Sequence, residues 1–545
     1  MVVDRGRTRD LDRWRGRALR YRRHMGLLAS SGAVSRSRRR AGQLVRRVTG
    51  RWPSGPLTGT LPLPTAGEIA RLESRNVDSV LAALGAAGIR HFLIPRPEPH
   101  NVHLGIAESD ALALLDALTH AAPAAHVSWA AESGWRTAVA GAARASITDR
   151  PTILWIHHDQ RVRTRADARD AARGVAVELW RPGQSGDLEA PTQNPYASVV
   201  SLRTPPVIAQ ARTGRRVATL PAFATPDIGE VRFPVDAAYL WVDGADPQWQ
   251  RRRDDALRDL GGPAESMDAS RFRQHDELRY SLRSLSMFAP WIRHVYLVTD
   301  GQAPPWLDRS CTRLTLIDHR ELMGDAGRLP TFNSHALAAR LHHIDGLADH
   351  FVYLNDDVFF GRRTGAELWF AGNGQPRFHN TATKVEPGDL DDLTPHAAAR
   401  NHTLEIVRRL TGRERRRNLQ HGPHAFSKQL LLELEALLPD EFSRTWHNQV
   451  RRSDDLVVEW LHHQYGYCTG RAVDSRVVRY EYVNIGQPDV TEVLERIRQA
   501  MPHTLCLNDG TGPNPAELRA RIVRDFLRTT FPTPSEFELG SALEA

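Results

Sequence analysis

The chain contains very little cysteine. Its 545 residues include three cysteines, and no two of them form a CxxC pair: Cys311, Cys468 and Cys506. An odd number without paired spacing excludes a disulfide framework and a zinc ribbon, and it is typical of a reducing compartment. We therefore expect three scattered, buried thiols.

Long hydrophobic runs are also missing. No stretch approaches the roughly 18 to 20 consecutive apolar residues that cross a bilayer. The N-terminus lacks a signal-peptide pattern, because Leu27-Leu28-Ala29 is too short for an apolar core and arginines lie on both sides. We therefore expect a cytoplasmic protein. A chain of 545 residues is too long for one core, which predicts two or three domains.

Lysine is nearly absent, so arginine carries the positive charge; the two lysines are Lys384 and Lys428. Of the net charge of +8, residues 1–51 carry +13, from 16 arginines and three aspartates, and the remaining residues carry −5. Such a tail suits peripheral contact with the anionic inner face of a membrane, where each basic residue contributes ~1 kcal/mol. A solvated arm is the open alternative, and nucleic acid is not the expected partner.

Composition divides the chain into three parts. Residues 1–64 form the basic tail and a Pro/Gly-rich linker, 65–225 a small accessory α/β domain, and 230–545 the predicted catalytic domain. The accessory domain carries helical spacing at 68–84 and 108–121 and strand patterns at 89–95, 152–157 and 175–180. It contains no compact chemical motif.

The third part contains buried-type strands that end in acid. Runs of β-branched and aromatic residues at 235–242, 294–299 and 351–354 lead to Asp243, Asp300 and Asp356-Asp357. Helical patterns occur at 248–260 and 276–285. In the second, Leu278, Leu282 and Leu285 are expected to line one face, with Glu277, Arg279 and Arg283 on the others. Such alternation predicts a doubly wound, mostly parallel sheet, in which ligands bind beyond the carboxyl ends of the strands. The expected ligand is a metal-bound polyphosphate.

The acidic pair Asp356-Asp357 is the first candidate metal site. Its backbone leaves the buried run Val352-Tyr353-Leu354, so these carboxylates do not belong to a solvated helix face. Mg²⁺ binds one or two carboxylates and fills its other positions with water and substrate phosphates.

A second acidic turn is Asp243-Gly244-Ala245-Asp246-Pro247. Gly244 allows a tight turn between the acids and Pro247 fixes the exit. Two interpretations stay open: Asp243 faces a ligand, or Asp243 caps the turn while Asp246 N-caps the helix that opens at Pro247.

Histidines and arginines downstream offer proton transfer and phosphate contacts. His421 and His424 flank Gly-Pro at an expected helix entrance, which favours anions, and a neutral imidazole accepts a proton near pH 7. Arg400 and Arg451 offer the planar fork that binds phosphate oxygens. Structural roles are the alternative for both histidines.

Together these segments resemble the Stealth family of hexose-1-phosphate transferases, which includes bacterial capsular polysaccharide phosphotransferases and the N-acetylglucosamine-1-phosphotransferase catalytic subunit. Four blocks carry the resemblance in order: 236–249, 271–357 with Pro330-Thr331-Phe332-Asn333-Ser334, 400–455 with His421-Gly422-Pro423-His424, and 506–538. Residues 1–230 lie outside it.

The resemblance implies transfer of a sugar-1-phosphate from a nucleotide diphosphate sugar to a hydroxyl of a capsular or cell-surface glycan. A phosphodiester forms and a nucleoside monophosphate leaves. It also implies a GT-A-like nucleotide-binding core with a helical C-terminal part. On this basis Asp357, with Asp356 or Asp243, is expected to hold Mg²⁺ or Mn²⁺.

The resemblance also implies roles for the other motif residues. Arg400 and Arg451 neutralise charge on the transferred phosphoryl group, and His421, or His424 in second place, takes the proton of the acceptor hydroxyl. The residues expected to bind the donor are Trp241, Asp243, Gly244, Asn333, Ser334 and Asn355.

One position departs from the family pattern, because Ala338 stands where relatives commonly have Glu. Two rival functions remain open. One is a conventional GT-A glycosyltransferase that uses the same donor site but makes a glycosidic bond. The other is a non-catalytic binder of nucleic acid or membrane that acts through the basic tail.

Overall fold

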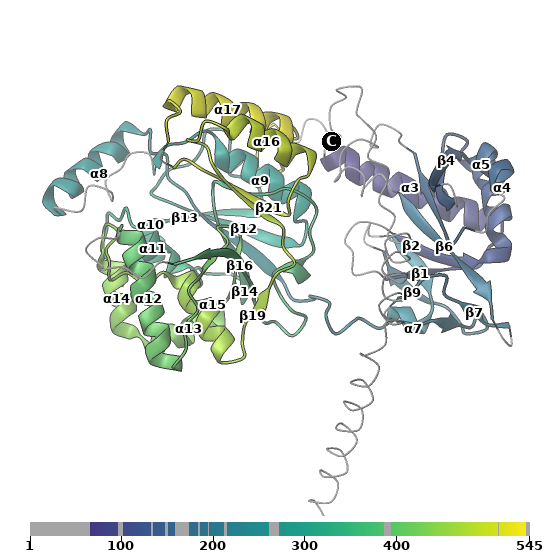
Figure 1. Cartoon of the computed structure of the whole chain (residues 1–545), viewed down its shortest axis with the longest axis horizontal. Helices are drawn as coiled ribbons and strands as arrows, with labels where there is room; N and C mark the ends of the chain where they lie inside the picture. The colour runs from purple at the N-terminus through teal and green to yellow at the C-terminus, as the bar shows by residue number, and fades with distance from the viewer. Residues whose placement is uncertain are drawn as a thin grey trace, which may run out of the picture. The chain divides into compact units, whose positions relative to one another are not determined.

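The computed structural model describes residues 66–95, 102–131, 134–147, 151–158, 174–183, 186–194, 196–211, 215–260, 272–385, 394–510 and 512–540 (Figure 1). The predictions for the basic tail lie outside these residues. Among the described helices, none is both long enough and apolar enough to cross a bilayer. The predicted domain boundaries stay predictions.

The chain before residue 225 contains a mixed α/β sheet with the strand order β1-β2-β6-β5. Strand β2 pairs antiparallel with β1 and parallel with β6. The predicted helices and strands are all present: α3 (Ala66–Ala86), β1 (His91–Ile94), α4 (Ala111–Ala121), β5 (Ile153–His157) and β6 (Val175–Pro182). The patterns missed β2 (His103–Ala107), β3 (His126–Ala131), β4 (Gly134–Val139), α5 (Ala140–Ser146) and the short strands β7 to β10 between Leu188 and Thr219.

A second sheet lies in the predicted catalytic part, with the strand order β13-β12-β11-β14-β18. The strands are β11 (Val235–Leu240), β12 (Ile292–Thr299), β13 (Leu314–Asp318), β14 (His350–Asn355) and β18 (His424–Ser427). The first four are parallel, and β18 joins β14 antiparallel. The prediction of a mostly parallel α/β sheet is therefore confirmed.

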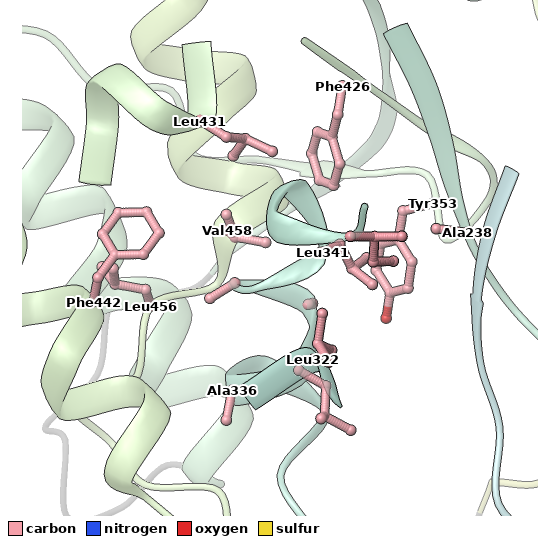
Figure 2. Packing of buried hydrophobic residues seen from close by; sticks show 14 of the residues in the cluster. Ala238, Leu322, Ala336, Leu341, Tyr353, Phe426, Leu431, Phe442, Leu456 and Val458 are labelled. Carbon is pink, nitrogen blue, oxygen red and sulfur yellow. The ribbon is translucent and has the colours of Figure 1, made fainter. Parts of the chain in front are cut away.

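Both faces of this sheet are buried, because successive side chains of a strand point to opposite sides. Ala238 and Leu240 of β11 belong to one core cluster with residues of helices α11 (Ser334–Ala338), α13 (Lys428–Leu437), α14 (Pro439–His447) and α15 (Val458–Cys468). Figure 2 shows Ala238 with other residues of this cluster. Ala237 and Tyr239 face α9 (Glu277–Phe288). Helices therefore cover both sides, as in a doubly wound fold.

Helix α9 confirms its predicted apolar face, since Leu278, Leu282 and Leu285 are buried. However, the same pattern placed Glu277 and Arg283 on other faces, and both are also buried. Arg283 is paired with Glu538 near the C-terminal end. Arg283 can therefore be buried because Glu538, 255 residues away in the chain, neutralises its charge.

The C-terminal part is rich in helices, as predicted. It contains α12 (Pro395–Thr411), α16 (Val490–Gln499) and α17 (Ala516–Thr530) besides α13 to α15. Short strands form two further sheets, with the orders β15-β21-β20 and β17-β16-β19. Their bounds include β16 (Arg377–Lys384), β17 (Arg417–Leu419), β19 (Val473–Ser475) and β20 (Tyr480–Asn484). Strand β15 (Val358–Phe360) pairs antiparallel with β21 (Thr504–Asn508), which places Cys506 opposite Val358 and next to the acidic turn.

Candidate active site

Two acidic loops meet where the order of the strands reverses. The chain runs from β11 outward through β12 to β13 and then returns to the other side of β11 as β14. Leu240 of β11 lies opposite Asn355 of β14, so the loops that follow leave the same edge of the sheet side by side. This is the switch point at which open α/β sheets bind ligands.

Gln302 holds the first loop in place by hydrogen bonds to both of its aspartates. Gln302 accepts the Asp243 N–H at 2.9 Å and donates to the Asp246 carboxylate at 2.9 Å. Gly244 is required, because an added Cβ would come within 2.0 Å of the Phe272 carbonyl oxygen. The loop therefore has one tightly defined path.

Both interpretations of this turn fit the structure. Asp243 Oδ1 accepts the Ala245 N–H at 2.9 Å, which makes it a turn cap. Asp246 Oδ1 accepts the Gln248 N–H at 2.8 Å and so N-caps α8 (Pro247–Leu260), as predicted. Asp243 as a ligand stays a proposal.

Gln274 connects the first loop with the second. Its amide nitrogen donates to the Val242 carbonyl at 3.2 Å and to Asp356 Oδ2 at 2.9 Å, while its oxygen accepts from the Trp241 indole at 3.1 Å. Trp241 itself is buried in the core. Asp356 is therefore engaged by the protein, and Trp241 offers little surface to a donor.

Asp357 has one occupied and one bare carboxylate oxygen. Oδ2 lies 3.3 Å from the Cys506 thiol, which donates to it. Oδ1 is buried and has no hydrogen-bond donor among the residues that the structure describes. His421 Nε2 lies 3.8 Å away, and the ligand atoms of Asp357, His421 and Cys506 lie within 4.8 Å of one another.

Several carboxyl groups lie close together around this turn, and each disfavours the charged form of the others. Burial and the neighbouring Asp357 raise the pKa of Asp356 to about 6. Burial and Asp356 raise the pKa of Glu277 well above its usual range. A bare carboxylate oxygen amid buried acids is chemically suited to a hard divalent cation.

His421 lies against the same turn. Asn355 accepts a hydrogen bond from the Tyr353 hydroxyl at 2.8 Å, and its amide nitrogen donates to His421 Nε2 at 3.0 Å. Burial lowers the pKa of His421, but the Asp357 carboxylate outweighs it, so the pKa is raised. His421, Asn355 and Asp357 are thus brought together as predicted.

The predicted helix entrance at His424 is wrong. His424 is the first residue of strand β18, opposite Tyr353 of β14, and α13 begins four residues later at Lys428. Burial lowers the pKa of His424 to about 3. This histidine is a neutral group within the sheet, and the argument from a helix end does not apply to it.

The predicted arginines lie on separate elements. Arg451, which precedes α15, donates to the Ser334 hydroxyl at 2.7 Å. Arg400 of α12 donates to Asn418 at 3.0 Å, and its guanidinium lies 5.9 Å from the centre of the Trp460 ring. Both arginines act on Glu459: burial raises the pKa of this carboxyl, while its backbone hydrogen bond and the charges of His421, Arg451 and Arg400 lower it.

Asn333 does not face this site. It is fully buried, its Oδ1 caps α11 by accepting the His335 N–H at 3.1 Å, and its Nδ2 donates to Asp455 at 2.9 Å. A side chain with all its polar atoms engaged does not suit direct donor binding. Its neighbour Ser334 is the residue that reaches Arg451.

Sequence reasoning missed several residues of the site: Gln274, Gln302, His335, His396, Glu459 and Cys506. Glu459 had a usable signal, because it is an acid within a helix whose other first-turn residues are apolar. Gln274 and Gln302 lie in loops, and His335, His396 and Cys506 lie in α11, α12 and β21, where no local pattern marks their side chains as part of a site. A second candidate metal group consists of His342, His343 and Glu435. It needs no metal, because both imidazoles bond to one Glu435 oxygen at 2.6 Å.

Comparisons with known proteins agree with the sequence pattern. Models of the Stealth protein conserved regions match in chain order: region 1 at 233–261, region 2 at 271–378, region 3 at 420–466 and region 4 at 495–545. An exopolysaccharide phosphotransferase of Streptomyces coelicolor is 36% identical over 504 residues, which are 87% of this chain and 84% of the relative.

Two further comparisons extend this result. The exopolysaccharide phosphotransferase CpsY of Mycobacterium tuberculosis is 34% identical over 376 residues, covering 67% of this chain and 70% of the relative. The galactosyltransferase LgtC, solved in complex with donor and acceptor sugar analogs, is 12% identical and covers 54% of this chain and 95% of LgtC, with a TM-score of 0.29. A TM-score this low does not assign a fold, so the GT-A likeness stays a prediction.

Proposed function

Since the chain belongs to the Stealth family of phosphotransferases, we propose that it transfers a sugar-1-phosphate from a nucleotide diphosphate sugar to a glycan hydroxyl in exopolysaccharide synthesis. The acceptor oxygen attacks the phosphorus that carries the sugar, and the bond from that phosphorus to the nucleoside monophosphate breaks. A phosphodiester remains on the glycan.

One observation carries this proposal: the bare Asp357 oxygen lies beside His421 at the switch point of the sheet. Asp357, with Asp243 on the neighbouring loop, would hold Mg²⁺ or Mn²⁺. Asp356 is the weaker candidate, because Gln274 already occupies one of its oxygens. The cation would supply charge neutralisation for the donor diphosphate and for the leaving nucleoside monophosphate.

The cationic side chains complete the site. Phosphoryl transfer depends mainly on positioning and on electrostatic stabilisation of the transferred group. Arg400, Arg451 and His421 lie close enough together to influence the same carboxylate, Glu459, and would contact the phosphate oxygens. Arg400 and Arg451 are half-buried, which strengthens their interaction with an anion.

The proposal is tested with purified protein, a panel of nucleotide sugars and a glycan acceptor, with Mg²⁺ or Mn²⁺ present. We expect release of nucleoside monophosphate and a phosphodiester signal in the ³¹P NMR spectrum of the product. Release of nucleoside diphosphate without that signal would identify a conventional glycosyltransferase instead. EDTA should stop the reaction, and added Mg²⁺ or Mn²⁺ should restore it.

Asp357→Asn is the matching variant. We expect it to fold and to lose transfer by at least roughly 10²-fold, because it removes the charge that would hold the cation. Asp349→Asn is the control, since Asp349 is an exposed aspartate just before the same strand. Wild-type turnover in Asp357→Asn would remove this residue from the site.

A further inference from the structure

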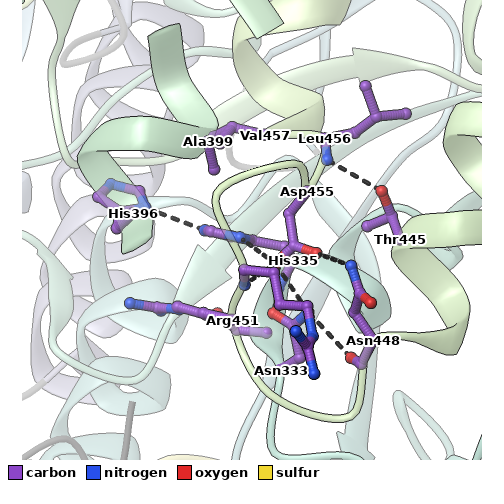
Figure 3. Close-up of polar contacts among 12 residues, drawn as sticks. Asn333, His335, His396, Ala399, Thr445, Asn448, Arg451, Asp455, Leu456 and Val457 are labelled. Carbon is purple, nitrogen blue, oxygen red and sulfur yellow. Dashed lines mark hydrogen bonds and ion pairs between the residues drawn. The ribbon is translucent and has the colours of Figure 1, made fainter. Parts of the chain in front are cut away.

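Asp455 is a buried carboxylate that accepts four hydrogen bonds. Asn448 donates to Oδ1 at 2.8 Å, and Oδ2 accepts from Asn333 at 2.9 Å, from the Arg452 N–H at 3.0 Å and from His335 Nδ1 at 3.0 Å. Figure 3 shows this arrangement around His335. Burial raises the pKa of Asp455 to about 6, but three of these donors, Asn448, Asn333 and the Arg452 N–H, can only donate, so near pH 7 the carboxylate is in its acceptor-only, ionised form.

This carboxylate fixes the tautomer of His335. Because an ionised carboxylate only accepts, His335 Nδ1 must carry a proton. The other ring nitrogen, Nε2, lies 2.9 Å from His396 Nδ1. In a neutral pair, His396 Nδ1–H donates to His335 Nε2, and His396 Nε2 is left with its lone pair.

His396 lies near Arg400 and Arg451, the two arginines that would bind phosphate. It lies on α12 four residues before Arg400, and positions four apart share one helix face. Burial lowers the pKa of His396 well below its usual value, and nearby His335, Arg451, Arg400 and His421 lower it further. Its Nε2 makes no hydrogen bond with any other described residue.

We propose that His396 Nε2 takes the proton of the acceptor hydroxyl and that His335 and Asp455 receive the resulting positive charge. This rests on the proposed phosphotransfer. As the acceptor oxygen bonds to phosphorus, its proton moves to His396 Nε2, and His396 Nδ1–H passes to His335 Nε2. The imidazolium of His335 then pairs with the Asp455 carboxylate.

Transfer of the proton from His396 to His335, called the relay below, moves positive charge away from the arginines. A proton that stayed on His396 would add a third cation beside Arg451 and Arg400. Passing the charge inward places it next to a buried anion instead, 3.0 Å from His335. His421 is less suited to this role, since its Nε2 already receives the Asn355 amide.

Binding of the donor should raise the pKa of His396. A diphosphate held by Arg451 and Arg400 compensates the cations that disfavour protonated His396, so the pKa of His396 rises in the complex. The acidic limb of kcat should therefore lie at higher pH than the acidic limb of kcat/KM. A histidine with only a structural role would not produce this difference between the acidic limbs of kcat and kcat/KM.

The test compares His396→Ala, Asp455→Asn and His447→Ala with wild type, after wild-type transfer has been established. His447 is the control, an exposed histidine of α14 whose Nδ1 donates to the Ser443 carbonyl at 2.7 Å. We expect His396→Ala to lower kcat by roughly 10² to 10⁴-fold with the donor KM changed far less, and added imidazole to restore part of it. His447→Ala should behave as wild type.

Asp455→Asn tests the tautomer directly. An Asn amide donates to His335 Nδ1, which reverses the direction of the relay, so kcat should fall while circular dichroism shows a folded protein. Wild-type kcat in His396→Ala, or a loss without imidazole rescue and with an unchanged acidic limb, would overturn the relay. Absence of transfer by wild type would instead refute the proposed function.

Discussion

Glu538 forms a buried ion pair with Arg283, and removing the Glu538 charge should strongly destabilise the predicted catalytic part. Arg283 Nε donates to Glu538 Oε1 at 2.8 Å and Nη2 donates to Oε2 at 2.7 Å, while Arg279 Nε adds a bond at 2.6 Å. Glu538 is 2% exposed and Arg283 is 7% exposed. This bidentate pair fastens the C-terminal segment to α9.

The size of the effect follows from burial. Glu538→Gln leaves the Arg283 cation buried without its counter-charge, a change that costs about 3–5 kcal/mol when one partner of a buried pair is removed. Glu536→Gln is the matched control, because its partner Arg313 and Glu536 itself have side chains 41% and 34% exposed. An exposed pair of this kind contributes ~1 kcal/mol or less.

Urea titration, followed by loss of transferase activity and by tryptophan fluorescence, measures both variants. Burial raises the pKa of Glu538, but its hydrogen bonds to Arg283 and Ser535 lower the pKa by more than burial raises it. The net pKa of Glu538 is therefore below its usual value. The contribution of the Glu538 carboxylate to the free energy of unfolding is thus complete above its unfolded-state pKa of ~4.3. It is lost as the pH falls through the lower pKa that Glu538 has in the folded protein. Equal midpoints for Glu538→Gln and Glu536→Gln at pH 7 would refute the reasoning.

Two further predictions concern the donor site and the tail. Gly244→Ala should displace the loop that carries Asp243, since the new Cβ would lie 2.0 Å from the Phe272 carbonyl oxygen, and turnover should fall about 10²-fold; Gly85→Ala, where an added Cβ meets nothing within 4 Å, should leave it unchanged. Deletion of residues 1–51, which hold 16 arginines, should leave turnover with a soluble acceptor intact and abolish sedimentation with anionic vesicles. Loss of turnover in the tail deletion, or normal turnover in Gly244→Ala, would contradict these expectations.

Local pattern predicted much of the architecture. Strands β11, β12 and β14 were visible because β-branched and aromatic runs ended in acid, and α9 was visible because its leucines follow the helical period. Edge strands were less visible. Residues 424–427 are a strand only because they pair with β14, and that pairing lies outside the reach of local periodicity.

The sequence alone determined the strand types, the acids at their carboxyl ends and the family motifs, since these depend on neighbouring residues. The tertiary structure decided which groups meet: Gln274 with Asp356, Cys506 with Asp357, and His335 with His396 and Asp455. These partners are 61 to 149 residues apart in the chain. Only the packing of distant elements brings them together, and no local pattern encodes such distances.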